Sequence, residues 1–544
     1  MRALALACLI IGSIACPGTQ QVGEHPSWRK ADPGTVQPVT FAPVAVAVSR
    51  YNEPILAPPT SPLGDAVIAA VTKAAQRVGK TPPIADARLF RACAELAEVY
   101  PQDGVIGYNL VEFALQRNGI IEPSPRLLVV WGDLDQAEAI VTQLEPQLAE
   151  VLTEGAHLRV GVGAAKRNAD GTGVIVFALQ SSSLSTAPIP RVVPAGGTLA
   201  LHVTVDPRYR EPEVFVTRDD GDTQRLDVVL GAAGAFASEL GCGAHKGRQQ
   251  LEITASDAAG STVLANFPVW CAAEPPIALE IAPASREDVV QKPTDAEQKL
   301  LVLVNRDRAA AGLGQLAWDE RVADVARGHS EEMKRTKVVA HVSPTTGSAA
   351  DRVRVANIKT AVVLENVARA YGVVEAHQAL MNSPGHRANL MSKIATTLGV
   401  GVVFGEEISG GREMFITQVF TRVPPKIDPT TAASVVAARI IAVHKATASD
   451  KLTAIARDVA VQLATGKSRD AVWPGVKLRI DALGNQYQKI GSVITAAADL
   501  DALDGKALLG DSLPDDIGVG IAQGTHPEIG DGAIWIVVLM GQRR

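Results

Sequence analysis

Three side chains capable of acid–base or metal chemistry stand in short turn-like segments of the central part of the chain. His341 is followed by Val-Ser-Pro-Thr-Thr-Gly, Glu365 is followed by Asn-Val-Ala, and His386 is preceded by Ser-Pro-Gly. Separations of 24 and 21 residues are short enough for one domain to bring all three into one cleft. We therefore expect a single site that contains two imidazoles and one carboxylate.

Two imidazoles and a carboxylate are compatible with three kinds of chemistry. They match an open metal site in which a further position holds water. One histidine could instead act as a general base that Glu365 orients. The three groups could also form a hydrogen-bonded cluster that joins loops without any ligand. The sequence has no His-Glu-x-x-His and no Gly-x-Ser-x-Gly motif, which excludes the common zincin and hydrolase-elbow sites.

Length and charge limit the classes of protein to consider. A chain of 544 residues is long enough for three or four domains of ordinary size. Only 4% of the residues are aromatic, so the cores must consist mainly of Val, Leu, Ile and Ala. The net charge of −6 gives no basic surface of the kind that nucleic-acid binding requires. We expect no nucleic-acid partner.

The N-terminus has the features of an export signal. Arg2 precedes an apolar run, and small residues precede Cys16. This end resembles a bacterial lipoprotein signal peptide over residues 1–16, in which Cys16 becomes the lipidated first residue of the mature chain. We expect an exported lipoprotein anchored in the membrane of the cell envelope, with simple secretion as the alternative. Residues 17–61, rich in Pro, Thr, Gln and Val, are expected to form a disordered tether.

Cysteine usage agrees with export. Cys242 and Cys271 fall in one candidate domain, and an oxidising compartment would favour a disulfide between them. Cys93 lies on the apolar face of an expected helix and is interpreted as a buried small hydrophobic residue.

Periodicity divides the rest of the chain into domains. Residues 62–183 combine helical patterns with two strands, whereas apolar residues alternate with a period of two over residues 186–273, which predicts a small Ig-like β-sandwich. Residues 274–296 are expected to be a linker. A Gly-x-Gly strand entry recurs at Gly161, Gly399 and Gly518, which indicates an internal repeat whose third copy lies in residues 430–544.

A series of short motifs occurs in order along residues 297–424: Asn305, Arg308, Trp318-Asp319, His329-Ser330, His341-x-Ser343-Pro344, Asp351-Arg352, Glu365-Asn366-x-Ala368, Ser383-Pro384-Gly385-His386-Arg387 and Gly399-Val400-Gly401. With these motifs, the segment resembles a bacterial CAP domain, the family of cysteine-rich secretory proteins, antigen 5 and pathogenesis-related 1 proteins, also called SCP-like. The resemblance implies an α+β fold: an α-β-α sandwich with a shallow cleft into which the trio projects. Gln418, which is equivalent to Gln180 in the internal repeat, is expected to line the cleft or to bond the edge of the sheet. The flanking segments lack the trio and look like degenerate CAP-like domains. A fourth acidic cleft residue, seen in many eukaryotic relatives, has only Glu332 and Glu375 as candidates.

The leading functional hypothesis is a cell-envelope or extracellular protein that binds a lipid, peptide, glycan or metal in its cleft. The alternatives are a hydrolase of an extracellular polymer, with His341, Glu365 and His386 as candidate catalytic groups, and a structural module of the envelope. No cofactor is required, although zinc, calcium or magnesium could bind at the same three residues. The expected partners are the membrane, through the N-terminal lipid, and an unknown extracellular ligand or envelope component.

Overall fold

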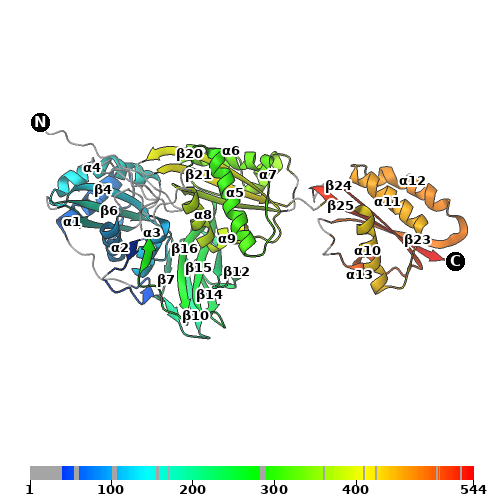
Figure 1. Ribbon diagram of the computed structural model, residues 1–544, viewed down its shortest axis with the longest axis horizontal. Coiled ribbons are helices and arrows are strands. Elements are labelled where there is room, and N and C mark those ends of the chain that lie inside the picture. Colours follow the sequence, from blue (N-terminus) through cyan, green and yellow to red (C-terminus); the bar gives the residue numbers. More distant parts are fainter. Residues whose placement is uncertain are drawn as a thin grey trace. The chain divides into compact units, whose positions relative to one another are not determined.

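The chain is described by a computed structural model that contains mixed α/β regions and, between them, a region of consecutive β-strands (Figure 1). The expected signal peptide and the first part of the expected tether lie outside the described residues. Within the described parts, no helix is both long enough and apolar enough to span a bilayer. The described residues are 39–43, 45–53, 61–100, 107–154, 159–168, 171–281, 290–358, 360, 362–408, 411–422, 426–497, 500, 503–526 and 530–544.

The chain divides into two compact units. Residues 1–349, 365–393 and 399–419 form the first, and residues 350–364, 394–398 and 420–544 form the second. The first unit holds the N-terminal domain, a β-domain and most of the central domain, whereas the second holds the C-terminal domain.

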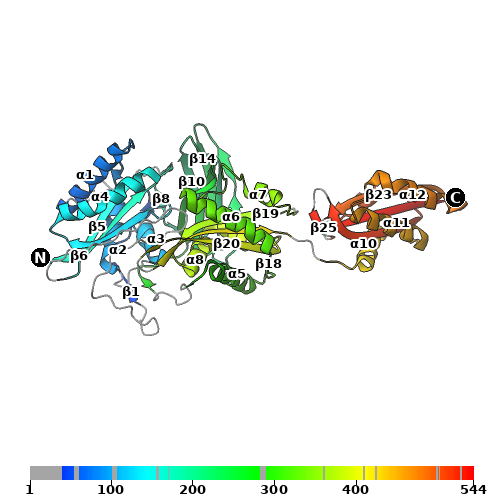
Figure 2. The same cartoon turned by 90° about the horizontal axis from the view of Figure 1, so that it is seen from above.

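The N-terminal domain is a four-stranded sheet between two pairs of helices. Figure 2 shows α1 and α4 on one side of the sheet and α2 and α3 on the other. Successive side chains of β4 point to opposite faces of the sheet, so both faces are apolar and each is covered by helices. Leu127 and Val129 pack with α2 and α3, and Leu128 and Val130 pack with α1 and α4. The strand order is β3-β5-β6-β4. The elements are α1 (Pro62–Arg77), β3 (Ile84–Ala85), α2 (Ala87–Val99), α3 (Tyr108–Arg117), β4 (Arg126–Asp133), α4 (Ala137–Glu154), β5 (Arg159–Lys166) and β6 (Thr172–Gln180).

The β-domain consists of two sheets that share one hydrophobic core. A disulfide joins Cys242 to Cys271 with their Cα atoms 5.7 Å apart, which confirms the expected pairing. The sheet orders are β13-β14-β10-β7 and β12-β11-β15-β16-β9. The strands are β7 (Leu184–Thr186), β8 (Ile189–Pro190), β9 (Val192–Val193), β10 (Thr198–Val205), β11 (Arg210–Thr217), β12 (Thr223–Leu226), β13 (Val228–Leu230), β14 (Ala235–Gly241), β15 (Gly247–Asp257) and β16 (Gly260–Cys271).

Part of the expected tether and linker is ordered into strands. β1 (Val39–Phe41) pairs with β17 (Leu279–Ile281), and β2 (Arg50–Tyr51) pairs with β8. Tyr51 is fully buried in the core of the β-domain, and its hydroxyl donates a 2.7 Å hydrogen bond to the carbonyl oxygen of Pro268. The expectation of a disordered tether is therefore wrong for residues 39–41 and 50–51, because burial of an aromatic ring offsets the entropy lost on ordering the backbone.

The central domain places its helices around a sheet of order β18-β20-β21-β19. Helix α6 begins where the Asp319 carboxylate accepts a 3.0 Å hydrogen bond from the backbone amide of Arg321, which is an N-cap. The elements are α5 (Pro293–Ala310), β18 (Ala317–Trp318), α6 (Glu320–Thr336), α7 (Ala349–Val355), β19 (Val363–Ala370), α8 (Val373–Asn382), α9 (Pro384–Leu390), β20 (Thr397–Ile408) and β21 (Gly411–Thr421).

The C-terminal domain has a sheet of order β22-β24-β25-β23. Helices α10 and α13 pack on one core of this sheet, and α11 and α12 pack on a second. The elements are α10 (Pro429–Val443), β22 (Thr447–Ala448), α11 (Asp450–Ala464), α12 (Arg469–Asp481), the 3₁₀ helix η2 (Gly484–Gln486), β23 (Tyr487–Ala497), α13 (Gly505–Leu509), β24 (Asp516–His526) and β25 (Gly530–Arg543).

The recurrent Gly-x-Gly pair has the same physical role in all three domains. A Cβ atom added at Gly163, Gly401 or Gly520 would lie 2.0–2.1 Å from the backbone of α2, α6 or α11, respectively. Only glycine lets the helix approach the strand so closely. The three sheets also share their strand order, counted within each domain. The interpretation of the outer domains as degenerate CAP-like domains remains a prediction.

Candidate functional site

His341 and Glu365 are in direct contact. Nδ1 of His341 lies 3.0 Å from Oε1 of Glu365, which is carried by β19. The side chain of His341 is 24% exposed and that of Glu365 only 4% exposed. The carboxylate therefore holds one nitrogen of a ring that solvent can reach.

His386 stands beside this pair on α9. Its ring centroid lies 6.5 Å from that of His341, and the two ring planes are inclined by 27°. Nδ1 of His386 lies 2.6 Å from Oγ of Ser383. The structure thus brings together the three residues that the sequence singled out, and we call His341, Glu365 and His386 the histidine site.

Two asparagines hold the histidine site together. Asn366 donates to the carbonyl oxygen of His386 at 3.2 Å and to Oε1 of Gln418 at 3.1 Å. Asn389 donates to the carbonyl oxygen of Glu365 at 3.0 Å and to Oδ1 of Asn366 at 2.9 Å. Strand β19 is therefore tied to helix α9 by side-chain amides.

Gln418 does not line the histidine site. Its exposed fraction is 0%, and its side-chain oxygen is used by Asn366. The expectation that it lines a ligand cleft is therefore wrong. Its β21 position directs the amide into the domain, where it supports the asparagine that holds His386 in place.

The β-domain contributes a further carboxylate that the sequence did not reveal. Glu252 on β15 accepts hydrogen bonds from the hydroxyl of Ser383 and, at 2.8 Å, from the backbone amide of Gly385. Its exposed fraction is 0%. The local sequence could not have identified Glu252. A charged residue between two apolar ones, here Leu251 and Ile253, is the ordinary pattern of an antiparallel strand with one face in solvent.

The β-domain also contacts both histidine-bearing segments through its backbone. The amide of Val342 donates a 2.9 Å hydrogen bond to the carbonyl oxygen of Ala259 in the turn between β15 and β16. The guanidinium of Arg387 donates to the carbonyl oxygen of Gly221 at 3.2 Å. The two domains therefore jointly position the rings of His341 and His386.

The surroundings change the protonation of two groups. Burial raises the pKa of Glu252 to about 7, and the hydrogen bonds from Ser383 and Gly385 oppose this rise only in part. Burial, followed by the charge of His341, lowers the pKa of His386 to about 3 even though the residue keeps some exposed surface. His386 is therefore a neutral imidazole at ordinary pH.

The two acidic candidates for a fourth site residue have other roles. Glu332 accepts a 2.6 Å hydrogen bond from the hydroxyl of Ser343 and a 3.0 Å bond from Thr346, so it braces the loop after His341. Glu375 accepts a 3.2 Å bond from the backbone amide of Tyr108 in the N-terminal domain.

His341 and His386 are the residues of the histidine site whose imidazole nitrogens could hold a metal ion. Among the described residues, three ligand atoms lie within 4.8 Å of one another only at Asp219, Asp220 and His245, which are on the surface of the β-domain. Glu365 is thus not placed as a third ligand, since its carboxylate meets the His341 ring. Metal-binding histidines commonly have one nitrogen bonded to a protein oxygen in this way, and both rings of the histidine site do.

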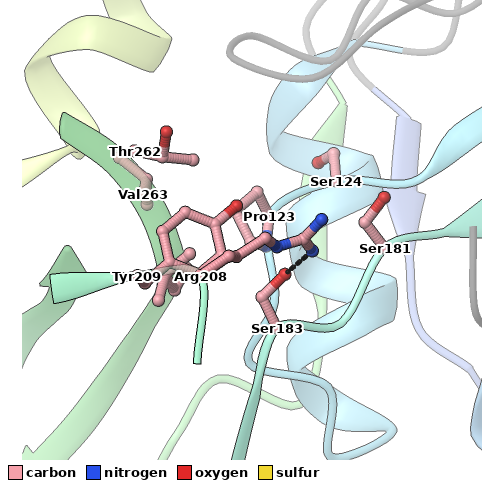
Figure 3. A pocket seen from close by; sticks show the side chains of 9 residues that line it. Pro123, Ser124, Ser181, Ser183, Arg208, Tyr209, Thr262 and Val263 are labelled. Carbon is pink, nitrogen blue, oxygen red and sulfur yellow. Dashed lines mark hydrogen bonds between the residues drawn. The ribbon is translucent and has the colours of Figure 1, made fainter. Parts of the chain in front are cut away.

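A separate hollow of about 160 Å³ lies between the N-terminal domain and the β-domain (Figure 3). Arg208 reaches across it and donates a 2.9 Å hydrogen bond to Ser183. Its lining does not include the histidine site, so the two features are distinct. The lining residues are Pro123, Ser124, Ser181, Ser183, Arg208, Tyr209, Thr262, Val263 and Leu264.

One family model matches the chain, and the match lies in the central domain. The model of the CAP family, described as the cysteine-rich secretory protein family, matches residues 301–420. Two proteins of Bacillus subtilis (strain 168) are similar. The uncharacterized membrane protein YlbC is 40% identical over 112 residues, which are 20% of this chain and 32% of YlbC. The uncharacterized protein YkwD is 37% identical over 108 residues, which are 20% of this chain and 42% of YkwD.

A solved structure is also similar. It is an extracellular protein containing a SCP domain from Bacillus anthracis, with 21% identity and a TM-score of 0.22, and the match covers 43% of this chain and 84% of that one. The chain spans less than half of either curated relative, so what is established concerns the matched domain. Residues 301–420 of this chain are a CAP domain, a member of the cysteine-rich secretory protein family.

Proposed function

We propose that this chain is an exported binding protein whose CAP domain binds a divalent metal ion of the zinc class through His341 and His386. One observation carries the proposal: each ring has its Nδ1 atom against a protein oxygen, from Glu365 in one case and Ser383 in the other. An incoming ligand would then meet the Nε2 atom of each ring. Glu365 would serve as the outer carboxylate that orients His341.

The chemistry of the donors favours zinc over calcium or magnesium. Imidazole nitrogen suits zinc and its neighbours in the transition series, whereas calcium and magnesium prefer oxygen ligands. The low pKa of His386, caused mainly by burial, keeps this ring neutral and able to donate a lone pair. A bound ion would supply a Lewis-acidic centre, and the residues described above would hold it and set the orientation of its ligands.

Binding is better supported than hydrolysis. Ser383 is near His386, as a nucleophile would be near its base, but it is only 6% exposed and its hydroxyl is engaged with Glu252. In a catalytic triad the acidic residue orients the histidine instead of contacting the nucleophile. The arrangement of Glu252, Ser383 and His386 is therefore that of a supporting hydrogen-bond chain.

Titration calorimetry of the full chain tests the proposal. Zinc should bind the parent protein with higher affinity than calcium or magnesium, and His341→Ala and His386→Ala should each lose that binding while remaining folded. His245→Ala is the matched control, because it removes a histidine from the exposed Asp219 and Asp220 cluster and should leave the tight site unchanged. Absence of zinc binding in the parent, or loss of all binding in His245→Ala, would overturn the assignment.

The second part of the proposal is that export leaves the chain anchored to a membrane through a lipid on Cys16. The apolar run before Cys16 and the Cys242–Cys271 disulfide, which suits an oxidising compartment, support it. Cys16→Ala should move the exported protein from the membrane fraction to the soluble fraction and remove the mass of the acyl groups. An unchanged membrane fraction would contradict the anchor.

A further inference from the structure

We propose that Glu252 is a positioning residue of the histidine site, which acts from the β-domain through Ser383 to fix the ring nitrogen of His386 that carries the proton. Three side chains from two domains form one chain of hydrogen bonds: the Glu252 carboxylate, the Ser383 hydroxyl and Nδ1 of His386. The inference rests on the proposed metal binding only for its functional consequence.

The backbone amide of Gly385 sets the direction of this hydrogen-bond chain. An amide N–H can only donate, so Oε1 of Glu252 must accept its 2.8 Å hydrogen bond. When Glu252 is ionised, Oε2 accepts the proton of the Ser383 hydroxyl. The Ser383 oxygen then accepts the proton on Nδ1 of His386, and Nε2 of His386 keeps its lone pair.

Glu252 packs closely against α9, which keeps Oε1 on the Gly385 amide and Oε2 on the Ser383 hydroxyl. A Cβ atom added at Gly385 would lie 2.7 Å from Oε1 of Glu252, so the glycine is what allows the carboxylate to reach the amide. Across the sheet Glu252 is flanked by Phe215 and Asn266, neither of which is charged. Between these residues, the Glu252 carboxylate accepts hydrogen bonds from Ser383 and Gly385.

Replacing the Glu252 carboxylate by an amide should reverse the direction of the hydrogen bonds that link residue 252, Ser383 and His386. In Glu252→Gln, the Gly385 N–H would still require an oxygen opposite it, which leaves the amide NH₂ group facing Ser383. The Ser383 oxygen would accept from that group, and its own proton would point to Nδ1 of His386. The ring proton would then reside on Nε2, where it blocks the lone pair that a metal ion needs.

Nitrogen-15 NMR of the full chain, labelled in its histidine rings, tests the inference without any metal. The His386 signals are assigned by their loss in His386→Ala, and spectra are recorded at pH 8.5. In the parent, Nε2 should give the pyridine-type signal. In Glu252→Gln, the pyridine-type signal should belong to Nδ1 instead. The same tautomer in both proteins would overturn the inference.

Glu112→Gln is the matched control. Glu112 is also a buried carboxylate, it also accepts from a serine hydroxyl, Ser124 at 2.7 Å, and burial also raises its pKa to about 7. It has no connection to His386 in the described contacts, so the parent tautomer should persist. If Glu252→Gln fails to fold, Ser383→Ala interrupts the same chain and should give averaged signals from both tautomers. A single, parent-like tautomer in Ser383→Ala would refute the inference.

Zinc titration of the same proteins separates this inference from the proposed function. Glu252→Gln should bind zinc at least about tenfold more weakly, as is usual for loss of an outer partner of a metal-binding histidine, and Glu112→Gln should match the parent. If the parent binds no zinc, the proposed function fails while the NMR result still decides the role of Glu252. If the parent binds zinc and Glu252→Gln binds it with equal affinity, the inferred link between the tautomer of His386 and zinc binding is wrong.

Discussion

The backbone amide of Val342 donates a 2.9 Å hydrogen bond to the carbonyl oxygen of Ala259. This bond ties the residue after His341 to the turn between β15 and β16 of the β-domain. The Glu252 side chain likewise ties the β-domain to the segment that carries His386, because it accepts hydrogen bonds from Ser383 and Gly385. The β-domain is therefore a structural partner of both imidazoles, and variants of its turn residues should affect the histidine site from outside the CAP domain.

Gly260→Ala should weaken zinc binding as well as stability. Gly260 has a φ of +100°, and an added Cβ atom would lie 2.9 Å from Cβ of His341. The left-handed backbone alone costs roughly 1–2 kcal/mol for a residue with a side chain, and the clash must also displace His341. Urea unfolding and zinc titration would measure the two effects.

Gly243→Ala is the control for Gly260→Ala. Its φ is +53° and nothing lies within 4 Å of the added Cβ atom, so it has a backbone cost without a clash. It should lose stability but keep the zinc affinity of the parent. Equal zinc affinities for the two variants would show that the turn does not position His341.

Gly401→Ala should strongly destabilise the CAP domain. An added Cβ atom would lie 2.1 Å from the backbone nitrogen of Arg327, and a helix backbone cannot yield as a flexible side chain can. We expect a loss of about 3 kcal/mol in the free energy of unfolding, measured with urea. Gly314→Ala, with open space around its added Cβ atom, should change the stability little. Similar losses for both variants would contradict the close-packing explanation.

The features that could be predicted from sequence are those set by short segments. The trio was identifiable because each member stands in a short motif, and β19 and α9 bring those motifs together within one domain. The Gly-x-Gly pairs were identifiable because the need for close helix–strand contact recurs in every copy. Both the site motifs and the Gly-x-Gly pairs are visible in the sequence because each requirement falls on a few neighbouring residues.

The features that could not be predicted depend on distant surfaces. Glu252 and Ser383 are 131 residues apart, and the alternating pattern of β15 cannot show that a second domain covers its outer face. Tyr51 was assigned to a tether because the proline-rich composition around it hid one aromatic anchor. Gln418 was misplaced because a strand position alone does not show which side chains cover it.

Loss of the disulfide should destabilise the β-domain. Cys242 and Cys271 are separated by 29 residues, and closing a loop of that length in the unfolded chain is worth about 3.6 kcal/mol. The double variant Cys242→Ala and Cys271→Ala should lose this amount in urea unfolding. Cys93→Ala, which removes a buried free thiol from the N-terminal domain, should cost about 1 kcal/mol. A double variant as stable as the parent would mean that the bond does not constrain the unfolded chain.

The pH dependence of stability should reveal Glu252 and His386 as opposing groups. Burial raises the pKa of Glu252 from 4.5 to about 7, so the folded state binds its proton more tightly and stability falls as pH rises between these values. Burial lowers the pKa of His386 from 6.5 to about 3, so the unfolded state binds that proton more tightly and stability rises with pH over that interval. Between pH 4.5 and 6.5 the two contributions have opposite slopes.

Glu252→Gln should remove the contribution of Glu252 to the pH dependence of stability and leave that of His386. The free energy of unfolding of the parent minus that of Glu252→Gln should fall by about 3 kcal/mol between pH 4.5 and 7 and stay constant above pH 7, as a difference of that size in pKa requires. Urea titrations at half-unit steps of pH measure it, and Glu239→Gln, a change at an exposed glutamate on β14, should give a flat difference. Parallel pH profiles for the parent and Glu252→Gln would mean that the carboxyl is not buried between the domains. A falling difference would show that the Glu252 carboxyl is buried in solution, as it is where β15 meets α9.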